Sequence, residues 1–261
     1  MHKMIPEERR NKIVEYISSK GTVTIPEISK KFEIAEITVR RDFDTLSKLG
    51  VIKKVYGGAA IKSNFFQEPF FLERINDNRE EKRRIAAEAV KRISDNSTIL
   101  LESGTTCLEL ARLLGQKKNI NVVTAAPHIV NILCNLKREN KFNGEILCCG
   151  GVWRGEPDDI FIGSQAINFF DSIRIGTAFF GIVAINLKDG WMAPSSFEAE
   201  LTKKIVSLAE KVIGITHHSK FNRISFTKIG LVSLFDEIIT DTGLSKEDIE
   251  KYQKEVKITI C

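Results

Sequence analysis

Residues 24–58, TIPEISKKFEIAEITVRRDFDTLSKLGVIKKVYGG, constrain the fold of this chain more than any other segment, because they indicate two short helices separated by a three-residue turn. Pro26 suits the first turn of a helix, where its missing N–H would have no partner. Ile28 and Phe32 lie four residues apart on one face of that helix. A second helix is expected over about residues 36–48, closed by a glycine. Two helices joined by so short a turn predict a helix-turn-helix, whose second helix enters the major groove of DNA.

The second helix has an apolar face and a polar face. Val39, Phe43 and Leu46 fall at positions i, i+4 and i+7 and form an inward stripe. Another face carries the candidate DNA contacts Thr38, Arg40, Arg41 and Thr45. Arginine is the side chain that most often reads guanine in the major groove, so we expect this face to meet base edges or adjacent phosphates.

Residues 51–56 are β-prone and basic and precede Gly57 and Gly58, which predicts the wing of a winged helix-turn-helix. Three residues of this wing are expected to contact phosphates: Lys53, Lys54 and Tyr56. A helix over about residues 6–19 would complete a three-helix core. The alternative is a solvated helical hairpin with ordinary surface charges.

The distribution of charge argues against that alternative. Residues 1–62 hold 13 Lys and Arg against 8 Asp and Glu, a net charge of +5. The whole chain holds 39 and 34, also +5, which leaves 26 of each sign in residues 63–261. All of the excess positive charge therefore lies in the segment that would meet phosphates, as binding by counterion release requires.

From residue 79 onward, helical segments alternate with short apolar runs. We expect helices over about 80–93, 107–114, 127–136, 163–170, 197–210 and 245–252, and strands over 98–101, 120–124, 145–149, 177–183, 212–216, 237–240 and 256–260. This alternation predicts an α/β domain with a largely parallel sheet covered on both faces. The expected organisation is a winged helix-turn-helix domain over residues 1–60, a linker over 61–78 and the α/β domain over 79–261.

The loop between the first strand and the next helix of that domain is the best candidate ligand site, because open parallel sheets bind ligands at the carboxyl ends of their strands. It consists of Glu102, Ser103, Gly104, Thr105 and Thr106. Gly104 allows close approach of a ligand to the backbone. The N–H groups that follow lie at the start of a helix, as in a phosphate cradle. The alternative is that Ser103 or Thr105 merely caps the helix. No Walker A loop and no G-x-G-x-x-G is present, which argues against nucleoside triphosphates and dinucleotides.

Other features bound the class of protein. The longest apolar runs are far short of the ~18–20 residues that cross a bilayer, and the charged start of the chain lacks the apolar core of a secretion signal. The five cysteines, Cys107, Cys134, Cys148, Cys149 and Cys261, are odd in number and form no C-x-x-C pair. We therefore expect a protein of the reducing cytoplasm, without a membrane partner, a cofactor or a metal.

Several side chains allow two interpretations. The adjacent His217 and His218 would suit a metal, but a strand end without a third ligand is the more usual setting. Glu198 and Glu200 would suit general bases, but their spacing from neighbouring lysines favours an ion-paired helix face. Trp191 would suit a lid over a pocket, although a place in the core is more usual for such a residue.

The whole chain resembles the DeoR family of bacterial transcriptional regulators. In the N-terminal part the similar residues are 38–43, TVRRDF, and 56–59, YGGA. In the C-terminal part they are 101–106, 122–124, 150–151 with Arg154, Gly163 with Ala166, 219–221 and 239–241. The resemblance implies a winged helix-turn-helix joined to a sensor domain similar to the ribose-5-phosphate isomerase and CoA-transferase folds. It also implies a repressor of a sugar-catabolic operon that leaves double-stranded DNA when it binds a phosphorylated sugar.

On this resemblance we expect the phosphorylated metabolite to contact residues 102–106 together with Gly150, Gly151 and Lys220. The chain also departs from the family pattern. Glu33 and Ala35 stand where a turn glycine and an N-cap serine are common, at a cost of up to about 1 kcal/mol each. Five further departures concern the sensor site: Glu102, Ala125, Ala126, Thr202 and His217. They remove hydrogen-bond donors and a charge, which suggests an unusual effector or weakened sensing.

The first hypothesis is therefore a DNA-binding repressor controlled by a small phosphorylated metabolite, acting as a dimer or tetramer because one recognition helix reads only a few base pairs. The second is an enzyme of sugar-phosphate isomerase type with a nucleic-acid-binding appendage, against which the lack of a convincing acid/base pair counts. An RNA-binding module is a third reading, but the chain lacks an aromatic stacking platform.

Overall fold

The computed structural model describes residues 6–48, 52–61, 71–155 and 159–261, and the chain divides into two compact units, Met1–Gln67 and Glu68–Cys261. Each unit is considered by itself. In the described residues, no helix combines the length and apolar character needed to cross a membrane.

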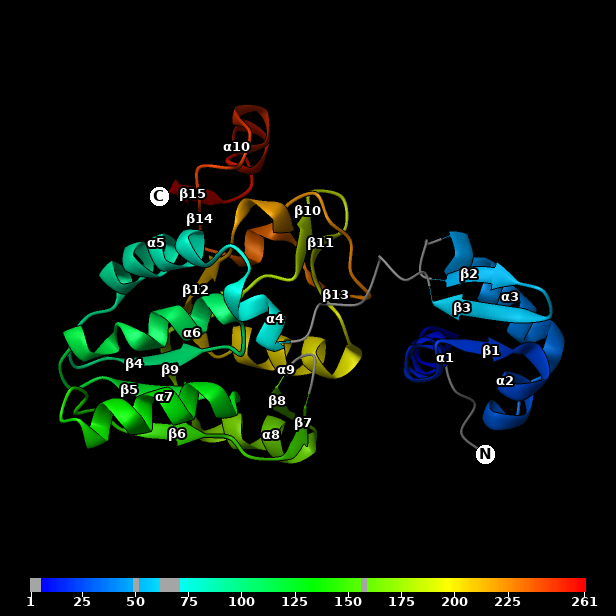
Figure 1. Ribbon diagram of the computed structural model, residues 1–261, viewed down its shortest axis with the longest axis horizontal. Coiled ribbons are helices and arrows are strands. Elements are labelled where there is room, and N and C mark those ends of the chain that lie inside the picture. Colours follow the sequence, from blue (N-terminus) through cyan, green and yellow to red (C-terminus); the bar gives the residue numbers. More distant parts are fainter. Residues whose placement is uncertain (1–5, 49–51, 62–70, 156–158) are drawn as a thin grey trace. The chain divides into compact units, whose positions relative to one another are not determined.

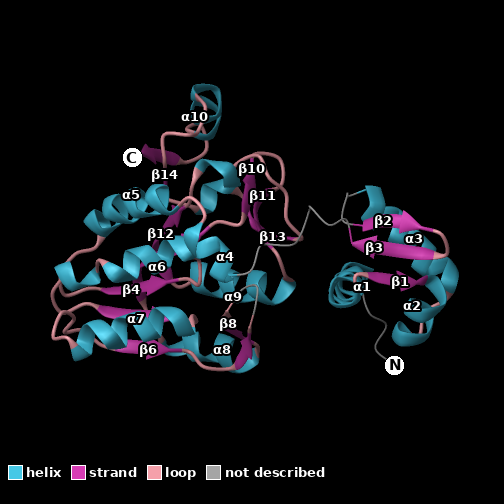
Figure 2. Cartoon of the chain, viewed as in Figure 1, coloured by secondary structure: helices cyan, strands magenta, loops and turns pink. Residues whose placement is uncertain are grey.

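The first unit is a winged helix-turn-helix (Figure 2). It contains α1 (Pro6–Lys20), β1 (Thr22–Thr24), α2 (Ile25–Phe32), α3 (Glu36–Lys48), β2 (Ile52–Val55) and β3 (Gly58–Ile61). The three strands form an antiparallel sheet in the order β1-β3-β2. The predicted inward stripe of α3 is confirmed, since Val39, Phe43 and Leu46 are all buried.

Local polar contacts fix the start and end of α2. Thr24 caps its N-terminus in a capping box with Glu27, in which each side chain accepts from the other residue's backbone N–H. Glu27 also accepts hydrogen bonds from Tyr16 and Lys20 of α1, at 2.8 and 2.7 Å. At the other end Glu33 adopts the left-handed conformation, with φ 52° and ψ 44°, which is the geometry that a glycine C-cap usually supplies.

The second unit is built on a seven-stranded sheet in the order β15-β14-β12-β9-β4-β5-β6, in which every neighbouring pair is parallel. The strands are β4 (Thr98–Leu101), β5 (Asn121–Thr124), β6 (Ile146–Cys148), β9 (Ile175–Gly181), β12 (Ala209–Ile215), β14 (Glu237–Thr240) and β15 (Lys257–Ile260). The predicted parallel α/β architecture is confirmed.

Helices cover both faces of this sheet. The elements are α4 (Phe71–Asn76), α5 (Arg79–Ala89), η1 (Val90–Arg92), α6 (Thr105–Arg112), η2 (Leu114–Gln116), α7 (Pro127–Arg138), α8 (Ser164–Phe169), η3 (Phe170–Ser172), α9 (Ser196–Val206), η4 (His218–Lys220), η5 (Val232–Leu234) and α10 (Lys246–Tyr252). Figure 1 shows α5, α6 and α7 side by side on one face. Successive strand residues alternate between two apolar cores: Ile99 and Leu101 pack with α5–α7, whereas Leu100 packs with α8–α10.

Two smaller sheets accompany the large one. The strands β10 (Ala184–Asn186), β11 (Gly190–Ala193) and β13 (Thr227–Gly230) form an antiparallel sheet, and β7 (Val152–Arg154) pairs with β8 (Ile160–Ile162). None of these short strands was expected from the sequence. The helix expected over 197–210 also ends earlier, at Val206, because Ala209 already pairs with β9.

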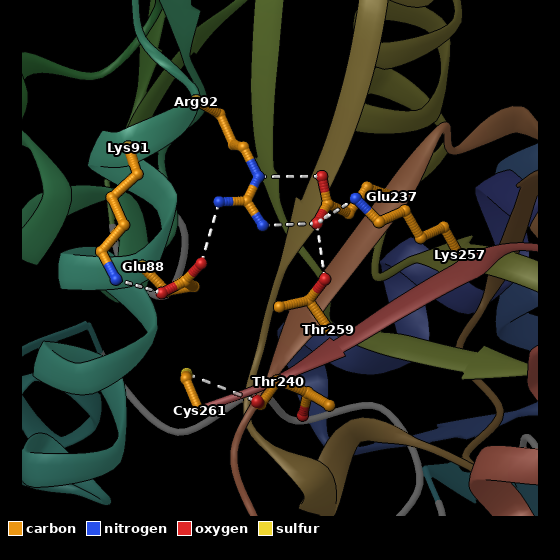
Figure 3. Close-up of polar contacts among 8 residues, drawn as sticks. All are labelled: Glu88, Lys91, Arg92, Glu237, Thr240, Lys257, Thr259 and Cys261. Atoms are coloured by element: carbon orange, nitrogen blue, oxygen red, sulfur yellow. Dashed lines mark hydrogen bonds and ion pairs between the residues drawn. The ribbon is translucent and has the colours of Figure 1, made fainter.

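An ion-pair network ties the end of α5 to the edge of the sheet (Figure 3). Arg92 donates two hydrogen bonds to the buried carboxylate of Glu237, at 2.8 and 3.1 Å, and one to Glu88 at 2.8 Å. Thr259 and Lys257 of β15 contact the same carboxylate of Glu237. The Arg92 guanidinium is the main reason why the pKa of Glu237 falls to about 2.

The segment expected as a linker, residues 61–78, contains the helix α4. Phe71, its first residue, is buried in the core shared with α5, α6 and α7. Of the phenylalanines expected to pack against another part of the protein, Phe71 therefore packs in the core of the second unit, and Phe70 lies outside the described residues.

Candidate functional site

The structure brings the predicted DNA contacts together on α3. Arg40 and Arg41 are exposed and Thr38 is half-buried. The side chain of Arg40 lies 3.7 Å from Glu36, one turn earlier. The hydroxyl of Thr45 donates to the carbonyl of Arg41 at 3.0 Å, so its hydrogen is already used within the helix.

The predicted wing is the β2–β3 hairpin. Lys53 and Lys54 on β2 are exposed, and Tyr56 at its tip is fully exposed, at 107%. Lys54 forms an ion pair with Asp44 of α3, which joins the wing to the recognition helix. The exposed side chains of α3 and of the β2–β3 hairpin therefore lie on the same small unit.

Asp42 has a structural role that the sequence analysis did not assign. It lies on α3 beside Arg41 but is buried, with an exposed fraction of 3%. Arg9 of α1 donates to both of its carboxylate oxygens, at 2.7 and 3.1 Å, and Arg10 lies 3.7 Å away. This bidentate pair fixes the recognition helix to α1. In the motif RRDF, two exposed residues, Arg40 and Arg41, are thus followed by two buried ones, Asp42 and Phe43, which hold the helix in the unit.

In the second unit a cavity of about 230 Å³ lies at the carboxyl ends of three adjacent strands, β4, β9 and β12. It is lined by Arg74, Asp77, Lys82, Glu102, Ser103, Gly104, Thr105, Thr106, Gly181, Ile182, Val183, Glu198, Thr216, His217, Ser219, Lys220 and Arg223. The predicted loop and Lys220 therefore meet in one place. Gly150 and Gly151 do not line this cavity; they follow β6 and precede β7.

The loop expected as a phosphate cradle already holds a carboxylate of its own. Glu102 accepts from the hydroxyl of Ser103 at 2.8 Å and from the backbone N–H of Gly104 at 3.0 Å. Burial raises the pKa of Glu102 in spite of these donors. Gly104 packs closely against Gly181, since an added Cβ would lie 3.1 Å from the Cα of Gly181, closer than an ordinary van der Waals contact. Thr105 and Thr106 begin α6 and remain on the cavity wall.

Positive charge enters the cavity from three separate segments. Arg74 belongs to α4, Lys82 to α5, and Lys220 and Arg223 to the segment after β12. Lys82 is buried, and burial lowers its pKa to about 8. Apart from Lys220, these cations were not identified from the sequence, because they are far apart along the chain.

His217 is a neutral member of the cavity wall at pH 7. Burial, together with the nearby charges of Lys220 and Lys82, lowers its pKa to about 4. Its Nδ1 lies 2.9 Å from the hydroxyl of Ser219. His218 instead contacts Asp241 at 2.7 Å. Among the residues that the structure describes, no group of three or more His, Cys, Asp or Glu is placed to hold a metal ion.

Glu198 differs from its expectation. It was assigned to an ion-paired helix face, but its exposed fraction is 7% and it accepts from the hydroxyl of Ser195 at 2.9 Å. Since helix α9 starts at the cavity, Glu198 lies on the cavity wall, whereas Glu200 is exposed. The cavity therefore contains the carboxylates of both Glu102 and Glu198.

The remaining residues that depart from the family pattern are dispersed. Thr202 lines a neighbouring cavity of about 20 Å³ with Trp191, while Ala125 and Ala126 are buried and line neither cavity. Trp191 is a core residue, packed against Phe180 and Phe235 with ring centroids 5.0 and 4.5 Å apart. Five substitutions in one pocket were expected; of these, Glu102 and His217 lie in the main cavity.

Comparisons with known proteins agree with both units. A model of the DeoR-like helix-turn-helix domain matches residues 9–65, and one of the DeoR C terminal sensor domain matches residues 77–242. The chain is 31% identical to a putative aga operon transcriptional repressor of Escherichia coli O157:H7, over 95% of this chain and 90% of that protein.

It is also 29% identical to the glycerol-3-phosphate regulon repressor of Escherichia coli K12, over 90% of each chain. A solved D-ribose-5-phosphate isomerase in complex with phospho-erythronic acid aligns with a TM-score of 0.40 and 18% identity, over 55% of this chain and 54% of that one. The sequence matches, which cover both the DNA-binding and the sensor part, identify regulators rather than enzymes. The chain belongs to the DeoR family of helix-turn-helix transcriptional regulators.

Proposed function

We propose that this regulator is a repressor of a sugar-catabolic operon, and that a phosphorylated sugar or a related metabolite binds the cavity of the second unit and releases the protein from its operator. The observation that carries the proposal is the cavity itself, where cations and carboxylates meet at the strand ends. Relatives named for the aga operon and for the glycerol-3-phosphate regulon support the class of operon.

The chemistry of the cavity supports a ligand with two kinds of polar group. Lys82, Lys220 and Arg223 supply donors and positive charge for a phosphate. Glu102 and Glu198 are acceptors that suit the hydroxyl groups of a sugar or polyol. Because Glu102 already occupies the N–H of Gly104, we place the phosphate nearer the cations than the start of α6.

The proposed reading of DNA rests on α3 and the wing. Arg40 and Arg41 would enter the major groove with Thr38, while Lys53 and Tyr56 would contact phosphates from the hairpin. We assign Thr45 to the edge of this surface, because its hydroxyl bonds to the backbone of α3. A homo-oligomer, a dimer or tetramer in the cytoplasm, would place several such surfaces on repeated half-sites.

The test is a fluorescence-anisotropy titration of the full chain against its own upstream DNA at fixed salt, with and without a panel of sugar phosphates and glycerol 3-phosphate. One compound is expected to weaken operator binding, with a coupling of roughly 5–150-fold. Lys220→Met should reduce the response to that compound, whereas Lys211→Met, an exposed lysine of β12, should not.

Specific operator binding that no compound of the panel changes would overturn the proposed effector class. Absence of specific binding to upstream DNA would overturn the proposed operon. Unphosphorylated sugars provide the control for chemistry, since the cations of the cavity favour the phosphorylated form.

A further inference from the structure

The helix α4 is both a wall of the cavity and the first described element that follows the DNA-binding unit. It begins at Phe71, and residues 62–70 separate it in sequence from β3. Arg74 on α4 and Asp77 just after it line the cavity. Figure 1 shows α4 beside α6, the helix that starts at the cavity. A change in α4 would therefore reach the chain that leads to the DNA-binding unit.

A buried ammonium group holds two carbonyl groups, one near the end of α4 and one just after it. The Nζ atom of Lys82, on α5, donates to the carbonyl of Arg74 and, at 2.6 Å, to that of Asp77. A positive charge at this end of a helix also matches the direction of the helix dipole. An ammonium has three N–H donors, and Lys82 lines the cavity, so its third donor can serve an anion there.

The first residue of α4 is held by a separate set of contacts. The ring of Phe71 packs against that of His128 on α7, with centroids 4.1 Å apart. Nδ1 of His128 lies 2.9 Å from Asp159, whose other carboxylate oxygen accepts from the indole N–H of Trp153 at 2.8 Å. One end of α4 is thus anchored to α7 and β7, and the other end to the cavity.

We infer that α4 is the element that transmits occupancy of the cavity toward the DNA-binding unit, by docking more firmly when an anion joins Lys82. The inference rests on the proposed function and adds its mechanism. Arg74 and Asp77 are on the cavity wall only while α4 is docked, so the complete set of ligand contacts exists only in that state. A ligand with higher affinity for the docked state shifts the population toward it.

The decisive variant removes the anchor of α4 without substituting any residue that lines the cavity. Phe71→Ala, in the full chain, is compared with Phe142→Ala, a phenylalanine of equal burial in the same core but outside α4. Operator affinity is measured by anisotropy, and binding of each sugar phosphate and of inorganic phosphate by calorimetry. Phe71→Leu serves as the milder variant if the alanine variant does not fold.

We expect Phe71→Ala to bind operator within a few-fold of the unaltered chain, and to bind the sugar phosphate more weakly because Arg74 and Asp77 leave the wall with α4. At saturating compound, the ratio of operator Kd values with and without the compound should fall toward one. Phe142→Ala should keep the ratio, which for such couplings is typically about 5–150. A Phe71 variant that keeps the full ratio would overturn the inference. A response that returns in full once the compound saturates the variant would also overturn it, since the role would then be in binding alone.

Hydrogen exchange gives a readout that does not depend on identifying the effector. Inorganic phosphate is expected to slow exchange of the amides of residues 71–76 in the unaltered chain. In Lys82→Met, which keeps the stem and removes the donors, those amides should exchange faster and phosphate should have no effect. Equal exchange in the two proteins would overturn the inference. If phosphate slows exchange in α4 as expected but no sugar phosphate changes operator binding, the proposed function alone is overturned.

Discussion

The two units use the same cationic side chains in opposite settings. In the first unit, Arg40, Arg41 and Lys53 are exposed on one helix and one hairpin, all within 14 residues of sequence. In the second unit, Lys82 is buried and meets Lys220 in a cavity assembled from segments far apart in the sequence. Exposed cations suit a long, highly charged partner, whereas enclosed ones suit a small anion whose shape is recognised.

The comparison also extends to the cations that maintain each scaffold. Arg9 is paired with the buried Asp42 in the first unit, and Arg92 is paired with the buried Glu237 in the second. These two pairs stabilise the fold, whereas the exposed cations of the first unit and the cavity cations of the second are available to ligands. Substitutions can therefore separate structural from ligand-binding arginines, and the effects should differ in size.

The largest effect is expected for Asp42→Ala. It leaves Arg9 without its partner inside a small unit, and breaking a buried pair costs roughly 3–5 kcal/mol. That is most of the stability of a domain of this size, so the first unit should unfold and operator binding should be lost. Circular dichroism measures the unfolding, and the anisotropy titration measures operator binding.

The control is Asp44→Ala, which removes the exposed ion pair with Lys54 and should cost less than about 1 kcal/mol. Equal losses of stability in the two variants would contradict the distinction between buried and exposed ion pairs.

Glu237→Gln is the corresponding change in the second unit, with an expected cost of roughly 3 kcal/mol because Arg92 remains charged. The effect should depend on pH. The folded-state pKa of Glu237 is about 2, below its ordinary value of 4.5. Its contribution is therefore present above pH 4.5 and is lost as the pH falls from there toward 2.

Denaturant unfolding of the unaltered chain and of Glu237→Gln at pH 7 and pH 3 measures this effect. The difference in unfolding free energy should be smaller at pH 3. Glu145→Gln is the matched control, because Glu145 is exposed and pairs with Lys137 at the surface, where such a pair contributes less than about 1 kcal/mol. A difference that does not change with pH would show that the ion pair is not the cause.

How far the sequence predicts each unit follows from the same comparison. The helix-turn-helix depends on residues within one turn of each other, such as Val39 and Phe43, so periodicity identifies it. The cavity depends on the sheet order, which brings β4, β9 and β12 together, and no local pattern connects Arg74 with Lys220. Glu198 was misassigned for this reason: it was grouped with Glu200, whose spacing from Lys203 suits a helix surface, but packing of α9 turns Glu198 inward.

Arg41→Ala tests the exposed surface and should weaken specific operator binding by about 1–3 kcal/mol, roughly 5- to 160-fold in Kd, without changing stability. If Arg41 contacts a phosphate, the salt dependence of binding should also decrease by about one unit of slope. Anisotropy titrations at several salt concentrations measure both quantities. Arg84→Ala, an exposed arginine of α5, is the control. Unchanged affinity for the Arg41 variant would place the reading face elsewhere.

The smallest effect is expected at the turn that sets the angle between α2 and α3. Glu33 has φ 52°, a conformation that costs a residue with a side chain about 1–2 kcal/mol. Glycine avoids that cost but loses about 0.4–1 kcal/mol through its freer unfolded chain. Glu33→Gly should therefore stabilise the first unit by about 0.5 kcal/mol, a rise of roughly 2–4 °C in its Tm. Glu36→Gly, at the first position of α3, should lower the Tm, since it adds freedom to the unfolded chain and removes an acidic side chain from the first turn of the helix. Operator affinity should stay the same in Glu33→Gly, because Glu33 lies outside the residues assigned to DNA. A lower Tm in that variant would mean that the side chain of Glu33 stabilises the turn by more than the left-handed backbone costs it.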